Sequence, residues 1–109
     1  MEQKRQPQHP GKVLQREYLE PLGISRNKLA MALHVPPPRL NEIVLGRRGI
    51  TADTALRLAK GLGTSPQFWM TLQMDYELAV AQEALGDRLE QEVRPVSLER
   101  LGEADGDDD

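Results

Sequence analysis

The sequence predicts an all-α protein of one domain, and three observations support this prediction. Its 109 residues are enough for one domain with a modest core. Apolar residues recur at spacings of three and four, which is the period of a helix face. Aromatic residues make up only 4% of the chain, so the core must consist mainly of aliphatic side chains, which suits closely packed helices.

The first helix is expected to follow a flexible polar segment at residues 1–8. Pro10 suits a first helical position, because the N–H that proline lacks would have no partner there. An apolar stripe follows, made of Val13, Leu14 and Tyr18. We expect this helix to end before Pro21, since the residue that precedes a proline avoids the helical region.

Two short helices joined by a tight turn are expected in the stretch SRNKLAMALHVPPPRLNEIVL. Ser25 can cap the first of them, because its hydroxyl can accept from a free backbone N–H. Ala30 is small enough to let the second helix approach closely. His34 lies in the turn, where a residue with positive φ is needed and histidine is enriched. Gly46 can end the second helix.

The second of these helices has an apolar face and a polar face. Leu40, Ile43 and Val44 are expected to be buried, whereas Arg39, Asn41 and Glu42 point outward. A small residue, a tight turn and then a short helix with outward polar side chains are typical of a DNA-binding helix-turn-helix. In that motif the second helix lies in the major groove.

Each exposed residue of this helix has a definable role if DNA is the partner. Arg39 can donate to guanine, Asn41 can pair with an adenine edge, and Glu42 can accept from a cytosine amine. The rings of Pro37 and Pro38 can contact thymine methyl groups. The alternative is an ordinary solvated face, but basic residues on both sides of the helix favour DNA binding.

The expected phosphate contacts flank this helix. Basic side chains lie in the preceding helix and after Gly46, and the free N–H groups of a helix start can also bind a phosphate. The residues expected to contact phosphates are Ser25, Arg26, Lys28, Arg47 and Arg48.

Two more helices follow. Thr51 is the expected cap of the fourth, whose inward residues are Ala55, Leu56, Leu58 and Ala59. Ser65 and Pro66 mark the start of the fifth, which has no breaker before Gly86 and can reach roughly 30 Å.

The fifth helix carries more apolar residues than one packed face requires. Phe68, Trp69 and Leu72 are expected inside the core. One recognition helix reads few base pairs, so we expect a two-fold homodimer with half-sites about one turn of DNA apart. The expected dimer interface consists of Met70, Met74 and Leu78.

Charge divides the chain into a basic part and an acidic part. Residues 1–74 contain 11 Lys/Arg and 5 Asp/Glu, whereas residues 75–109 contain 3 and 12. A basic part followed by an acidic tail fits a nucleic-acid binder, and the DNA-binding and dimerisation domain is expected at residues 9–85. We expect the acidic extension at residues 86–109 to be largely disordered. Its negative charge can be explained equally well by improved solubility as by a role in a nucleic-acid-binding protein.

Several other classes of protein are not expected. The chain has no cysteine, and its two histidines lack partners at metal-ligand spacing, so we expect no metal and no cofactor. No phosphate-binding glycine loop or nucleophile motif occurs, so we expect no catalytic residue and no enzyme. No apolar run approaches the roughly 18 residues of a membrane span, and the N-terminus lacks the apolar stretch of a signal peptide. A cytoplasmic location is therefore expected.

Over residues 9–82 the sequence resembles the HigA-type antitoxins, or VapI group, of the XRE helix-turn-helix superfamily. The motifs that carry the resemblance are HPG, EPLG, the VPP-R-NEI stretch, RRGITADTALRLA and SPQFW. This resemblance implies a five-helix, lambda-repressor-like homodimer that binds operator DNA in its own promoter. It also implies a partner, the RelE-like toxin HigB, which is an mRNA endonuclease.

Two residues depart from the family pattern. His34 stands where glycine is common, and Leu45 replaces a polar residue often found before the glycine, which removes one phosphate contact. Two alternatives stay open at this point. One is a stand-alone regulator without a toxin, and the other is a protein-interaction module that has lost DNA binding.

Overall fold

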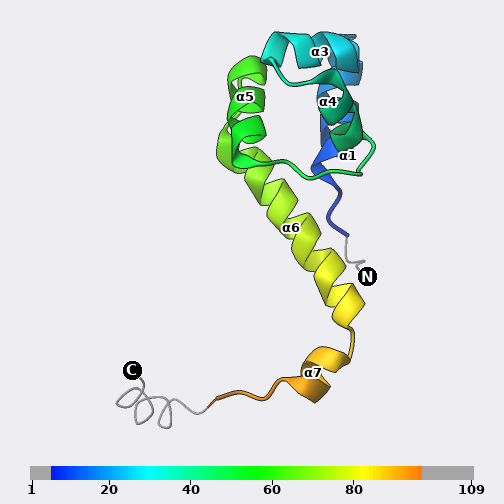
Figure 1. The fold of residues 1–109 in the computed structure, drawn as a ribbon, viewed down its shortest axis with the longest axis vertical. Coiled ribbons are helices and arrows are strands. Elements are labelled where there is room, and N and C mark those ends of the chain that lie inside the picture. Colours follow the sequence, from blue (N-terminus) through cyan, green and yellow to red (C-terminus); the bar gives the residue numbers. More distant parts are fainter. Residues whose placement is uncertain (1–5, 97–109) are drawn as a thin grey trace, which may run out of the picture.

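The computed structural model describes residues 6–96, and all its regular elements in that range are helical, which confirms the predicted all-α class. The elements are α1 (Pro10–Leu14), η1 (Gln15–Leu19), α2 (Glu20–Leu22), α3 (Arg26–Leu33), α4 (Pro37–Val44), α5 (Ala52–Leu62), α6 (Pro66–Leu85) and α7 (Arg88–Glu92). Helices α1 to α5 gather around the first half of α6, and we call this part the head (Figure 1). The rest of α6, residues 77–85, projects from it and is called the stalk (Figure 1).

The predicted helix starts and turns are present. Ser25, Thr51 and Ser65 each accept a hydrogen bond from the backbone N–H three residues further on. His34 has a φ of 58° and Gly46 a φ of 79°, so both lie in the left-handed region as their turns require. These confirmed caps and turns set the positions of α3, α4, α5 and α6.

The first helix does not end before Pro21, and that prediction is wrong. The helix continues through α2 and stops at Gly23, whose φ is 67°. Residues Gln15–Leu19 form a π-helical turn, in which the N–H of Glu20 donates to the carbonyl of Gln15, five residues back. This wider turn relieves the clash that the ring of Pro21 would make with a regular α-helix.

The core lies between α1, α3, α4, α5 and the first turns of α6. Its largest fully buried apolar side chains are Trp69, Leu14, Leu40, Ile43 and Leu58. Trp69 also satisfies its polar atom, because its Nε1 donates to Oγ1 of Thr64 at 2.7 Å. Burial of such side chains is worth roughly 1.5–3 kcal/mol each, so this cluster holds the head together.

Gly11 permits the close contact between α1 and α4. A Cβ atom at this position would lie 1.8 Å from the carbonyl oxygen of Ile43 and 2.9 Å from Cα of Val44. Both atoms belong to the backbone of α4 and cannot move alone. The position of α4 in the head therefore depends on the absence of a side chain at residue 11.

Two residues that were expected inside are exposed. Leu56 is 59% exposed and Phe68 is 36% exposed. Each is one residue away from a fully buried neighbour, Ala55 or Trp69, and so points about 100° away from the core on a helix of 3.6 residues per turn. Phe68 instead packs edge-on against Trp69, with ring centroids 4.9 Å apart.

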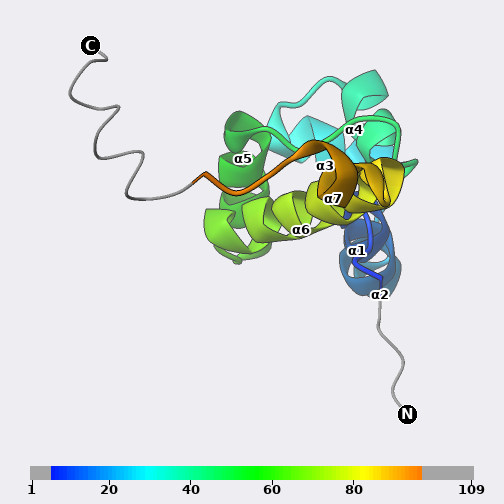
Figure 2. The ribbon, with the colours of Figure 1, turned by 90° about the horizontal axis from the view of Figure 1, so that it is seen from below.

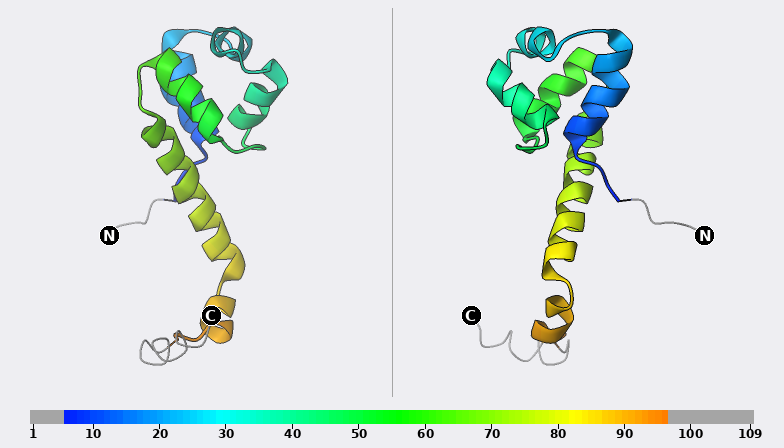
Figure 3. Two further views of the ribbon diagram at one scale, coloured as in Figure 1. Left: turned by 60° about the vertical axis from the view of Figure 1, so that its left-hand side comes forward. Right: turned by 90° about the vertical axis from the view of Figure 1, so that its right-hand side faces the viewer.

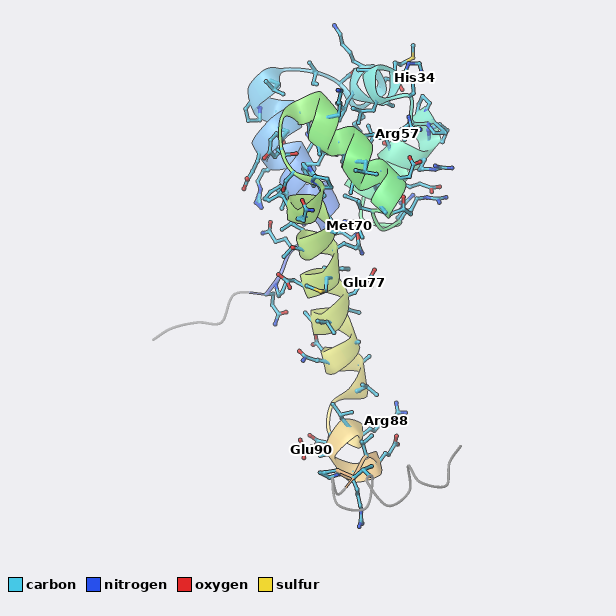
Figure 4. All side chains as sticks on the ribbon, turned by 90° about the vertical axis from the view of Figure 1, so that its left-hand side faces the viewer. His34, Arg57, Met70, Glu77, Arg88 and Glu90 are labelled. Carbon is cyan, nitrogen blue, oxygen red and sulfur yellow. The ribbon has the colours of Figure 1, made fainter. Side chains whose placement is uncertain are left out.

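The turn between α3 and α4 lies beside α5. Figure 4 shows His34 at this turn and Arg57 on the neighbouring α5. Nη1 of Arg57 donates to the carbonyl of Leu33 at 3.1 Å, so α5 satisfies one of the free carbonyls at the end of α3. The turn is thus supported by a contact from outside the motif.

Helix α6 is the longest element and reaches beyond the head. In the view of Figure 2, α3, α4 and α5 lie on one side of α6, and α1 and α2 lie on the other. Figure 3 shows the stalk leaving the head and ending near α7. Helix α7 falls within the extension that was expected to be largely disordered, and residues 97–109 lie outside the described residues, as do residues 1–5. Across residues 6–96, the helices are too short or too polar to span a bilayer.

Candidate nucleic-acid interface

The polar face of α4 is exposed as predicted. Leu40 and Ile43 are fully buried, and Val44 is nearly so. On the other side of the helix Pro37, Pro38, Arg39 and Asn41 are exposed, and Glu42 is partly exposed. The helix therefore presents all five predicted base-reading residues on the molecular surface.

The start of α3 lies beside this polar face. Nη1 of Arg26 donates to Oδ1 of Asn41 at 2.5 Å, which joins a predicted phosphate contact to a predicted base reader. Oγ of Ser25 accepts from the N–H of Lys28 at 3.0 Å. The N-terminus of α3, which favours anions, is thus held at the edge of the α4 surface.

The loop after α4 folds back onto the same helix. The backbone N–H of Arg47 donates to the carbonyl of Glu42 at 2.8 Å. Nε of Arg48 donates to Oε1 of Glu42 at 2.9 Å, and these two side chains are 50% and 44% exposed. Both predicted phosphate-binding arginines of the loop therefore lie next to the polar face of α4.

Gln73 fixes the other end of this loop, a role that was not predicted from the sequence. Its Oε1 accepts from the N–H of Ile50 at 2.7 Å, and its Nε2 donates to Oε2 of Glu77 at 2.8 Å. A Cβ atom on Gly49 would lie 2.9 Å from Nε2 of Gln73. The available signal was a polar residue four positions after Trp69, on a helix face that is otherwise apolar.

His9 is a second missed residue. Its side chain is only 8% exposed, its Nδ1 accepts from the N–H of Gly11 at 2.9 Å, and its ring meets Tyr76 edge-on at 4.9 Å. Burial lowers its pKa below 6.5, and a backbone hydrogen bond with Arg48 opposes this shift. His9 thus connects α1 and α6 to the loop that carries the arginines.

The charge of this surface is strongly positive. Its basic residues are Arg26, Lys28, Arg39, Arg47 and Arg48, and Glu42 is the carboxylate that lies among them. A surface of this kind attracts the phosphates of DNA. Residues 6–96 contain no group of three or more His, Cys, Asp or Glu side chains that could hold a metal ion.

The predicted dimer residues lie on exposed positions of α6. Met70 is 38% exposed, Met74 52% and Leu78 54%. Figure 4 shows Met70 near the head and Glu77 further along the helix. Their place at an interface between two copies stays a prediction.

Comparison with known proteins identifies the motif. Residues 15–69 match the helix-turn-helix family model HTH_3, and this match includes α3, α4 and the loop after α4. Virulence-associated protein I of Dichelobacter nodosus is 53% identical over 75 residues, which cover 69% of each chain.

Solved structures agree with this match. The Pseudomonas aeruginosa antitoxin HigA, solved with the higBA promoter, is 47% identical with a TM-score of 0.80, and the alignment covers 84% of this chain and 99% of that one. A HigA-family addiction module antidote protein from Coxiella burnetii is 44% identical with a TM-score of 0.79, covering 84% and 100%. This chain therefore belongs to the helix-turn-helix family, in the XRE-type group of the HigA antitoxins and VapI.

Proposed function

We propose that this protein is an antitoxin that binds an operator in its own promoter as a homodimer and neutralises a RelE-like HigB toxin. The observation that carries the proposal is the exposed polar face of α4, bordered by basic residues of α3 and of the following loop. The similar P. aeruginosa HigA was solved with its higBA promoter, which supports the same use of this surface.

In this proposal α4 enters the major groove. Arg39 donates to the O6 and N7 atoms of a guanine, Asn41 pairs with an adenine, and the rings of Pro37 and Pro38 lie against thymine methyl groups. Arg26, Lys28 and the loop arginines contact phosphates on either side of the groove, together with the N-terminus of α3.

Dimerisation through α6 brings two recognition helices to successive grooves. Met70, Met74 and Leu78 form the proposed interface, because their exposed apolar surface follows one side of the helix. The toxin partner is proposed from family membership. The protein acts where its operator is, in the cytoplasm, and no catalytic role is proposed for it.

The test is an electrophoretic shift of the protein's own promoter at two salt concentrations. Each phosphate contact releases counterions, so affinity should fall steeply as salt rises. No shift, or a shift that does not depend on salt, would contradict operator binding. Copurification with a small basic protein encoded beside the gene would test the toxin separately.

Arg39→Ala tests the base-reading role of α4. We expect a loss of about 1–3 kcal/mol in operator binding, concentrated at one base pair, because a bidentate contact to guanine is lost. The measurement is a binding titration against operators substituted at single positions. Equal loss on every sequence would make Arg39 a phosphate contact instead.

A further inference from the structure

The structure assigns Glu42 a role other than reading a base: we propose that it positions the side chain of Arg48 for a phosphate of the operator. This inference rests on the proposed operator binding and concerns how one contact at that site is prepared. It replaces the expectation that Glu42 accepts a hydrogen bond from cytosine.

Glu42 and Arg48 pair in a geometry that leaves the outer end of the arginine open. Oε1 of Glu42 accepts from Nε of Arg48 at 2.9 Å. This bond uses the inner nitrogen of the guanidinium, so the two terminal nitrogens remain free to form the pair of hydrogen bonds that phosphate accepts. Glu42 thereby fixes the direction of Arg48 and leaves its phosphate-binding end open.

The backbone around Arg48 is also supported. The loop is held on one side by the bond from the N–H of Arg47 to the carbonyl of Glu42, and on the other by the bond from Ile50 to Gln73. The backbone on both sides of Arg48 is therefore held, and the bond to Glu42 holds its side chain before DNA arrives.

Arg47 provides the contrast. It is the adjacent residue, carries the same charge and is exposed. Over residues 6–96 its side chain forms no hydrogen bond or ion pair with protein groups. A free arginine loses side-chain entropy when it binds, whereas an arginine that is already ordered loses less. The two arginines should therefore depend on Glu42 to different degrees.

The pair also reduces the electrostatic cost of a carboxylate on this surface. An unpaired Glu42 on a surface that meets phosphates would repel them, and its pairing with Arg48 removes most of that repulsion. The pair is about half exposed, so it contributes little to folding stability. Its main effect is on the position of Arg48.

A double-mutant cycle tests this assignment. Operator affinity is measured for the full chain and for Glu42→Ala in three backgrounds: wild type, Arg48→Ala and Arg47→Ala. We expect Glu42→Ala to weaken operator binding about three- to tenfold in the wild-type and Arg47→Ala backgrounds, the range expected for ordering one long side chain on binding. In the Arg48→Ala background the same change should have less than about a twofold effect.

A second variant and a second probe separate positioning from other roles. Glu42→Gln keeps an oxygen that accepts from Nε, so it should restore most of the lost affinity. Because Arg48 is proposed to contact a phosphate, the affinity lost in Glu42→Ala should be about the same for operators substituted at single positions, whereas a base reader would lose affinity at one base pair. Thermal unfolding monitored by circular dichroism should be the same for all variants, which excludes a folding defect.

Three results would overturn the assignment. Equal losses from Glu42→Ala with and without Arg48, concentrated at one base pair, would make Glu42 a base reader. A gain in operator affinity would make it only a repulsive charge. If the wild-type protein shows no salt-dependent operator binding, both the proposed function and this assignment are overturned. If the wild-type protein binds but the losses from Glu42→Ala and Arg48→Ala are additive, only the assignment is overturned.

Discussion

The head and the stalk contain parts of the same helix, α6, in opposite environments. In the head Trp69 is fully buried and Gln73 is 7% exposed, and both have hydrogen-bond partners in other parts of the fold. In the stalk Leu78 is 54% exposed and Val80 is 49% exposed. In the head, α6 is packed within one chain, whereas in the stalk it carries exposed apolar side chains that we propose a second copy covers.

The difference follows from the distribution of apolar residues along α6. A surface helix with one packed face has its apolar residues on one side. In α6 the apolar residues that face the head are interspersed along the sequence with Met70, Met74 and Leu78. These three residues lie on a different side of the helix. Four substitutions test whether the head and the stalk differ in this way.

The largest effect is expected in the head, from Gly11→Ala. The added methyl group would lie 1.8 Å from the carbonyl oxygen of Ile43, so α1 and α4 must separate. We expect the free energy of unfolding to fall by about 3 kcal/mol or more, measured by denaturant titration. Lys12→Ala, at the next and exposed position, is the control and should change it little. Equal stability of the two variants would show that the helices can separate without cost.

In the stalk, Leu78→Glu should dissociate the dimer and leave the head folded. Burial of one leucine is worth roughly 2 kcal/mol, and a carboxylate in its place must also be desolvated. Leu56→Glu is the matched control, since Leu56 on α5 is exposed to a similar extent. Sedimentation should give monomers for the first variant and dimers for the second. A dimeric Leu78→Glu protein would move the interface away from the stalk.

His34→Gly should stabilise the head slightly. His34 has a φ of 58° and is exposed, and a residue with a Cβ atom costs roughly 1–2 kcal/mol in this conformation. Glycine removes that cost but has more freedom in the unfolded chain, so we expect a net gain of about 0.5–1 kcal/mol. A higher midpoint in thermal unfolding checks this. A lower midpoint would indicate that the imidazole makes a stabilising contact.

The smallest effect concerns pH. Burial lowers the pKa of His9 in the folded head below 6.5, so the unfolded chain binds more protons between the two pKa values. The contribution of His9 to the free energy of unfolding is therefore fully present above pH 6.5, and it is lost as the pH falls through the pKa of His9 in the folded state. His9→Asn, which can still cap α1, should flatten the dependence of unfolding free energy on pH below 6.5. An unchanged slope would assign the dependence to other groups.

Local signals predicted most of the head. Ser25, Thr51 and Ser65 cap their helices, and His34 adopts the expected turn, because these features depend on neighbours within four residues. The polar face of α4 follows from the same short-range period. Short-range chemistry is what a sequence displays directly.

Contacts between distant segments were not predicted. The continuation of the helix through Pro21 depends on a π-helical turn that no residue pattern announces. Gln73 is buried because Ile50, 23 positions away, needs an acceptor. His9 depends on Tyr76 in the same way. Roles such as these arise because elements distant in sequence pack together in space. The periodicity of the sequence predicts which apolar positions are buried, but not these polar contacts.

Helix α6 contains no glycine or proline between Pro66 and Leu85 and therefore has no flexible joint. Two copies joined along α6 would keep their heads in one rigid orientation. Inserting roughly five base pairs into the centre of the operator, half of a turn of DNA, would turn the second half-site to the opposite side of the duplex. The protein could not twist to follow it, so the phase of the two half-sites matters as much as their sequence.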